Sequence, residues 1–209
     1  MKGKVTGISP PVWKYAAMAV EAWMNLSLAE RIKVTREAQT RMVPLVERWS
    51  TLDRDVSDAW SPRAAFAARM LSDAESIADL GCGHMLLERF LRPDQRYVPV
   101  DLVARCSRTV VCDFNRDQLP ALGVTHFAAL GLLEYIYNLD SFLRAVRGQF
   151  VGGVATFYVC RGTTETERLG AGWVNHHTEQ EIRQVLEATG FTIQEAFEWA
   201  SSHLMFRLI

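Results

Sequence analysis

Several features that define large classes of protein are missing from this sequence. The four cysteines form no Cys-x-x-Cys pair and show no zinc-ligand spacing, so we predict neither a metal site nor a disulfide framework. No run of about 18 apolar residues occurs, so we expect no membrane-spanning helix and no membrane partner. The 23 basic and 24 acidic side chains give a net charge of -1, which provides no overall attraction to nucleic acid. These absences favour a soluble protein of the reducing cytoplasm and leave its oligomeric state open.

The first quarter of the chain has a helical pattern. Apolar residues recur at three- and four-residue intervals from Val12 to Met24, which predicts one amphipathic helix. Ser27 followed by Glu30 predicts a capping box for a second helix, running from Leu28 toward Val43 with a kink at Pro44 if it extends further. We therefore divide the chain into a helical extension, residues 1–60, and a main domain, residues 61–209. The extension is expected either to cover a ligand site or simply to pack on the core.

The main domain alternates between helix-like and strand-like segments, with a hydrophobic content of 49% that suits a sizeable core. Ser61 before Pro62 predicts one helix start, and Thr178 with Glu181 predicts a capping box for another. Alternation of this kind predicts an α/β sheet, and the last two strands predict a closing antiparallel hairpin. Strands are expected at 77–80, 97–101, 109–114, 125–130, 153–159, 191–199 and 203–208, and helices at 61–71, 85–91, 140–147 and 178–188.

The segment 76–83, Ser-Ile-Ala-Asp-Leu-Gly-Cys-Gly, carries the most information about function. It predicts a buried strand that ends in a tight glycine turn, where the main chain is open to a ligand. Asp101 follows Asp79 by 22 residues and ends the next strand, which suits a carboxylate that accepts hydrogen bonds from ribose hydroxyls. Asp113 and Phe114 end the third strand and offer an acceptor beside an aromatic face, as an adenine ring needs.

In this order the motifs resemble those of class I S-adenosylmethionine-dependent methyltransferases, from about Asp73 to the end of the chain. The resemblance implies a Rossmann-like doubly wound sheet with a C-terminal antiparallel hairpin, with S-adenosylmethionine as the cofactor. It also implies methyl transfer to oxygen or nitrogen of a small-molecule substrate. The residues that it places at the cofactor are Asp79, Gly81, Cys82, Gly83, His84, Asp101, Leu102, Asp113, Phe114, Leu130, Gly131 and Glu134.

Methyl transfer needs alignment of the reactants, and it needs a base only if the acceptor must lose a proton. His176, His177 and Tyr135 are the candidate catalytic residues, and histidine is favoured because it titrates near neutral pH. His177 directly precedes the capping residue Thr178, so positioning that helix is its alternative role. His203, in the final hairpin, is expected to be structural.

The sequence departs from the family pattern at three places. Met85 stands where a third glycine is usual, and His126 stands where the fourth strand often begins with an acid. The link 103–108 is too short for the usual helix. We expect an abridged loop there, which would leave one face of the sheet for the N-terminal helices to cover.

Two other functions remain open. A binding or scaffold protein that keeps the fold and the cofactor without turnover would explain Met85 and His126. A nicotinamide-dependent oxidoreductase would explain the glycine turn alone, although the closing hairpin argues against it. Nucleic-acid amino groups are disfavoured as acceptors because the sequence lacks an Asn or Asp followed by Pro-Pro and an aromatic residue after the fourth strand. The many tryptophans could line a pocket for a small acceptor or belong to the core.

Overall fold

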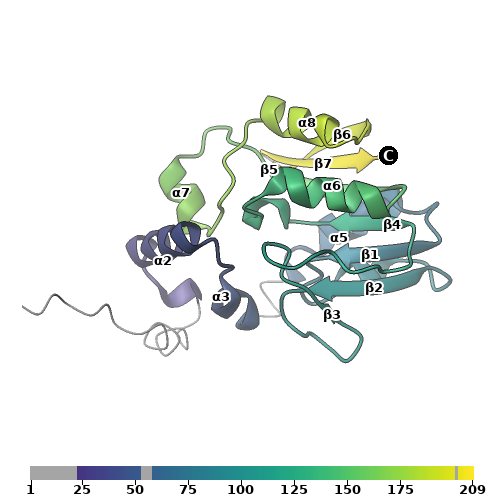
Figure 1. Cartoon of the computed structure of the whole chain (residues 1–209), viewed down its shortest axis with the longest axis horizontal. Coiled ribbons are helices and arrows are strands. Elements are labelled where there is room, and N and C mark those ends of the chain that lie inside the picture. The colour runs from purple at the N-terminus through teal and green to yellow at the C-terminus, as the bar shows by residue number, and fades with distance from the viewer. Residues whose placement is uncertain (1–22, 53–57, 201) are drawn as a thin grey trace, which may run out of the picture.

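The computed structural model describes residues 23–52, 58–200 and 202–209, so most of the first predicted helix lies outside the described residues. Within those residues, no helix is long and apolar enough to cross a membrane. Figure 1 shows one sheet with helices on both of its faces and a group of helices beyond one of its ends.

All seven predicted strands are present, in the order β3-β2-β1-β4-β5-β7-β6. The first five lie parallel to one another, and β7 runs antiparallel to both β5 and β6. The third strand is shorter than the sequence predicted and pairs only through Val110 and Val111. The strands are β1 (Ser76–Leu80), β2 (Arg96–Asp101), β3 (Val110–Val111), β4 (His126–Ala129), β5 (Gly152–Tyr158), β6 (Ile193–Ala200) and β7 (His203–Leu208).

Alternating side chains divide the core between the two faces of the sheet, as expected for strands buried on both sides. On one face, Ala78 and Phe127 pack with α6 (Leu139–Gln149) and α8 (Glu179–Ala188). On the other face, Ile77 and Ala128 pack with α5 (Ser61–Met70) and the short 3-10 helix η2 (Leu87–Phe90).

Two helix starts differ from the sequence prediction. The segment 85–91 forms only the single turn η2, because Met85 takes a left-handed φ of 56° at the point where a longer helix would begin. At α5 the N-cap is Trp60 and Ser61 is already helical, so the serine makes no cap. Pro62 still lies in the first turn, where its missing N–H costs nothing.

The described part of the N-terminal extension contains η1 (Trp23–Asn25), α2 (Leu28–Arg41) and α3 (Val46–Ser50). The capping box of α2 is confirmed, since Ser27 Oγ accepts from the Glu30 amide at 3.3 Å and Glu30 accepts from the Ser27 amide at 2.8 Å. The helix ends at Met42, with φ 49°, so the chain breaks before Pro44 instead of kinking there.

These N-terminal helices lie beyond the carboxyl ends of the parallel strands, beside α7 (Glu165–Gly170) (Figure 1). The Thr35 hydroxyl of α2 donates to the Leu169 carbonyl of α7 at 2.8 Å, and both residues are buried. The 103–108 link is the abridged loop that we predicted. The expectation that the extension covers the sheet face beside this loop is wrong for α2, which packs on α7 instead.

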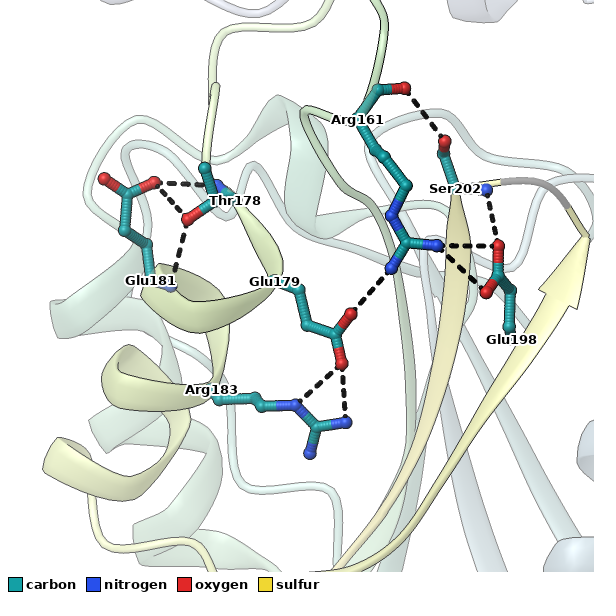
Figure 2. Close-up of polar contacts among 7 residues, drawn as sticks. All are labelled: Arg161, Thr178, Glu179, Glu181, Arg183, Glu198 and Ser202. Carbon is teal, nitrogen blue, oxygen red and sulfur yellow. Dashed lines mark hydrogen bonds and ion pairs between the residues drawn. The ribbon is translucent and has the colours of Figure 1, made fainter.

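Figure 2 shows how the loop after β5 is tied to the end of the chain. The Arg161 guanidinium pairs with Glu179 of α8 at 2.8 Å and with Glu198 of β6 at 3.0 Å. The capping box of α8 lies beside it, with the Glu181 carboxylate accepting from the Thr178 amide at 2.7 Å, as predicted. These ion pairs are exposed, so their contribution to stability is small.

Candidate functional site

A cavity of about 260 Å³ lies at the carboxyl ends of the parallel strands. Its floor comes from the residues that follow β1, β2, β3 and β4, and its cover includes Leu45, Arg48 and Trp49 of the N-terminal extension. His203 also reaches it, because β7 starts where β5 ends and the two strands pair His203 with Tyr158. Ligands of doubly wound sheets bind at this edge.

The glycine turn has the backbone that the sequence predicted. Gly81 and Gly83 both have positive φ, at 77° and 50°, and both line the cavity. Met85, in place of a third glycine, adopts a φ of 56° that glycine would take without strain. The left-handed conformation costs about 1 kcal/mol or more at a residue with a side chain. The turn is therefore kept without the third glycine.

Asp101 joins the second strand to the glycine turn. Its Oδ2 accepts from the Gly83 amide at 2.8 Å and its Oδ1 accepts from the Val103 amide at 2.9 Å. Arg105 lies 3.4 Å from Oδ1 and forms an ion pair with it. Each carboxylate oxygen can accept more than one hydrogen bond, so Asp101 can still bind two hydroxyls of a ligand. Only 5% of its surface is exposed, which fixes its position.

Asp79 lies on the same face of the sheet, at the cavity end of β1. The Tyr97 hydroxyl donates to its Oδ2 at 2.7 Å. With only 3% of the residue exposed, burial raises the pKa of the Asp79 carboxyl to about 7, while the bond from Tyr97 opposes this increase. A cation bound in the cavity would favour the charged carboxylate.

Asp113 and Phe114 line the cavity after β3, as predicted. The Asn115 amide donates to Asp113 Oδ1 at 3.0 Å, and burial raises the pKa of Asp113. Phe114 packs edge-on against Phe142 of α6, with ring centroids 5.4 Å apart. One aromatic side chain is thus held beside one carboxylate at this end of the cavity.

Eleven of the twelve proposed cofactor residues line the cavity, and Glu134 does not. Glu134 lies in the 3-10 turn η3 (Leu133–Tyr135), is fully buried, and accepts from the Tyr158 amide at 2.8 Å through Oε1. Its second oxygen has no hydrogen-bond partner among the described residues. Burial raises its pKa. The structure therefore places Glu134 behind the cavity wall instead of at a cofactor.

The three candidate catalytic residues separate in the structure. Tyr135 lines the cavity, whereas His176 and His177 do not. His176 Nδ1 accepts from Arg168 Nε at 3.2 Å, and the His177 ring lies against Phe157, with centroids 5.9 Å apart. Burial lowers the pKa of His177, and partial desolvation beside Arg168 lowers the pKa of His176, although His176 is an exposed residue. Their positions support a structural role close to α8.

His203, which we expected to be structural, lines the cavity instead. Its Nε2 lies 4.0 Å from Glu134 Oε1, and its ring lies edge-on to Tyr158 at 4.8 Å. Burial, with a smaller contribution from Arg63, lowers the pKa of His203 to about 4. The imidazole is therefore neutral at physiological pH and can accept a hydrogen bond.

Aromatic side chains form the part of the cavity beneath the N-terminal extension. Trp49 and Tyr135 meet at an interplanar angle of 87°, with ring centroids 4.8 Å apart. The Tyr135 hydroxyl accepts from Trp173 Nε1 at 2.9 Å and from Arg48 Nη2 at 3.3 Å. Arg48 also donates to the Ala171 carbonyl. The polar atoms of this wall are bonded to one another, which leaves apolar ring surface for a ligand.

Neither a known family model nor a curated protein sequence matches the chain. Solved structures do match. A Nostoc punctiforme protein, titled a candidate O-methyltransferase, is 12% identical with a TM-score of 0.62, over 78% of this chain and 61% of that chain. The Burkholderia thailandensis 1,6-didemethyltoxoflavin N1-methyltransferase is 16% identical with a TM-score of 0.55, over 98% of this chain and 92% of that one.

A third similar structure is CalO1, a methyltransferase in calicheamicin biosynthesis, solved with S-adenosylhomocysteine bound. It is 17% identical with a TM-score of 0.59, over 94% of this chain and 66% of that chain. The chain has the class I methyltransferase fold. It spans less than two thirds of the Nostoc protein and about two thirds of CalO1. The predicted fold, with its C-terminal hairpin, is therefore confirmed.

Proposed function

We propose that this protein transfers a methyl group from S-adenosylmethionine to an oxygen or nitrogen atom of a small molecule. One observation carries the proposal: the glycine turn, Asp101 and Asp113 line a single cavity in the order that an adenosine ligand requires. Asp101 is bonded to the turn itself through the Gly83 amide at 2.8 Å. Solved structures of the same fold include methyltransferases with S-adenosylhomocysteine bound.

The residues present suit this cofactor. The open backbone at Gly81 and Gly83 leaves room beside the main chain, Asp101 suits the ribose hydroxyls, and Asp113 with Phe114 suits adenine. When bound, the cofactor supplies an electrophilic methyl group on a sulfonium. The protein's own part is to hold the acceptor in line and to keep water out, for which Trp49, Tyr135 and Trp173 offer rigid apolar walls.

His203 is the best-placed base if the acceptor must lose a proton. It is the histidine on the β7 side of the cavity, and its pKa of about 4 keeps the ring neutral at physiological pH. The ring can therefore accept a hydrogen bond from the acceptor, as a weak base whose contribution comes from its position. Tyr135 suits this role less, because burial raises its pKa and its oxygen already accepts two hydrogen bonds.

Thermal unfolding with and without S-adenosylhomocysteine tests the proposal. The ligand is expected to raise the melting temperature, and Asp101→Ala is expected to remove the increase because the ribose loses its acceptor. Asp73→Ala is a control at an exposed aspartate that pairs with Arg207. Absence of any increase in the wild type, with either the product or S-adenosylmethionine, would refute the proposal.

A cofactor-binding protein without turnover is the second candidate. The positions of His176 and His177 away from the cavity favour it, since they leave His203 and His84 as the histidines that reach the cavity. His84 Nε2 lies 3.0 Å from the Leu52 carbonyl, which gives it a structural partner. Transfer of radiolabelled methyl to any member of an acceptor panel of phenols, amines and carboxylates would exclude this candidate.

A further inference from the structure

Arg63 is a cavity residue that no sequence motif indicated. It lies in the first turn of α5, is partly buried, and stacks on Trp60 with its guanidinium carbon 5.4 Å from the ring centroid. The guanidinium lies against Gly131: a methyl group built on that glycine would be 2.7 Å from Nη1. Gly131 has φ 72° and follows β4, so the absence of a side chain there makes room for the arginine.

The charge of Arg63 has no close partner in the described part of the chain. No carboxylate of those residues forms an ion pair with it, and Glu134 and Asp79 act on it only at longer range. The other two arginines of the cavity differ. Arg105 pairs with Asp101, and Arg48 donates to Ala171 and Tyr135. A guanidinium withdrawn from water without an anion is costly, so Arg63 is suited to an anionic group of a ligand.

The position of Arg63 relative to the strands of the sheet indicates which anionic group of the ligand it would meet. The sites proposed for adenine and ribose follow β3 and end β2, at Asp113 and Asp101. The next strands in the sheet are β1 and β4, and the Arg63 guanidinium lies beside Gly131, two residues after the end of β4. An adenosine ligand that begins at β3 and continues across the sheet therefore places its amino-acid end at Arg63.

We propose that Arg63 binds the carboxylate of the amino-acid half of the methyl donor. This inference rests on the proposed function, because it assumes S-adenosylmethionine as the donor. A planar guanidinium can donate two parallel hydrogen bonds to one carboxylate, a geometry that lysine cannot reproduce. Asp79, at the cavity end of β1, would otherwise repel the ligand carboxylate when Asp79 is ionised.

The test compares two ligands that differ in the amino-acid half. S-adenosylhomocysteine carries the carboxylate, and 5′-methylthioadenosine lacks it. Isothermal titration calorimetry is expected to show that Arg63→Met weakens S-adenosylhomocysteine binding about 10- to 100-fold and changes methylthioadenosine binding by less than about twofold. Arg63→Lys is expected to fall between the wild type and Arg63→Met. The control is Arg69→Met, on the exposed side of the same helix, where both affinities should stay unchanged.

The possible failures are distinguishable. Equal loss of both ligands in Arg63→Met would overturn the inference and show that the arginine only maintains the fold of the site. Unchanged binding of both ligands would also overturn it, and a raised KM for an acceptor in that variant would assign the arginine to the acceptor. If the wild type bound neither compound, the proposed function itself would fail.

Discussion

Replacing Asp79 with asparagine is expected to stabilise the unliganded protein, and increasingly so as pH rises. The carboxyl lies at the cavity end of β1 with 3% of the residue exposed, and its one side-chain partner is the Tyr97 hydroxyl at 2.7 Å. Burial of this kind disfavours the charged form, which is why its pKa rises from 3.8 to about 7. An asparagine oxygen can still accept from Tyr97 and never ionises.

The sign of the effect follows from the two pKa values. A carboxyl whose pKa is higher in the folded state binds its proton more tightly there, so its favourable contribution is complete below pH 3.8. That contribution is lost as pH rises through about 7, since the unfolded chain then releases the proton more easily. The full loss corresponds to about 4 kcal/mol, at roughly 1.4 kcal/mol for each pKa unit.

Urea unfolding of wild type and Asp79→Asn at pH 5 and pH 8 measures this difference directly. Between those pH values the stability of the variant relative to the wild type should increase by roughly 2 to 3 kcal/mol. Asp73→Asn serves as the control at an exposed aspartate. A difference that stays constant with pH, or a wild type that gains stability on the variant toward pH 8, would refute the reasoning.

Two further substitutions test the cavity. Gly131→Ala is expected to weaken S-adenosylhomocysteine binding about 10-fold or more, because its methyl group would lie 2.7 Å from Arg63 Nη1 and the φ of 72° adds strain. Calorimetry measures this affinity, and Gly162→Ala is the control, since Gly162 has a φ of 73° and open surroundings. Equal binding by the two variants would contradict the prediction. His203→Gln is expected to lower kcat about 100-fold for an acceptor that must lose a proton, with cofactor affinity unchanged. Steady-state kinetics on phenol acceptors checks this, and an unchanged kcat would exclude His203 as the base.

The strands and the glycine turn of this fold follow local rules, so the sequence predicts them well. The Gly-x-Gly that follows the first strand predicts the turn at Gly81, and the acidic residue at the end of the next strand predicts the position of Asp101. Neither prediction needs tertiary information. The prediction of a helix at 85–91 was wrong because it used the spacing of apolar residues, which does not reveal that Met85 takes a positive φ.

The part of the cavity proposed for the methyl acceptor is formed by contacts between segments that are distant in the sequence. The spacing of residues along the sequence does not reveal such contacts. The Asn175 amide donates to the Leu133 and Ile136 carbonyls, both at 2.6 Å, and this buries Asn175. His176, the next residue, is exposed instead. Within η3, likewise, Tyr135 lines the cavity while its neighbour Glu134 lies behind the wall. Adjacent residues of an irregular segment thus take opposite directions, and no motif decides which one reaches the ligand.

His203 could have been found from the topology that the sequence did predict. A closing antiparallel hairpin brings the first residue of its last strand to the edge where the parallel strands end, which is the ligand-binding edge. The histidine at that first position was therefore a site candidate on geometric grounds. Arg63 had no such signal, because a helix that precedes the first strand can direct its third residue toward the sheet or away from it.

Under the proposed function, the charges around the cofactor residues would favour release of the product. This part of the cavity contains three carboxylates, Asp79, Asp101 and Asp113, and two arginines, Arg63 and Arg105. It therefore carries one net negative charge when Asp79 is ionised. S-adenosylmethionine carries a sulfonium and an ammonium against one carboxylate, whereas the product has lost the sulfonium charge. Electrostatic attraction in a partly buried cavity therefore favours the donor over the product. Because the pKa of Asp79 is about 7, this preference should decline below neutral pH, where that carboxylate takes up a proton.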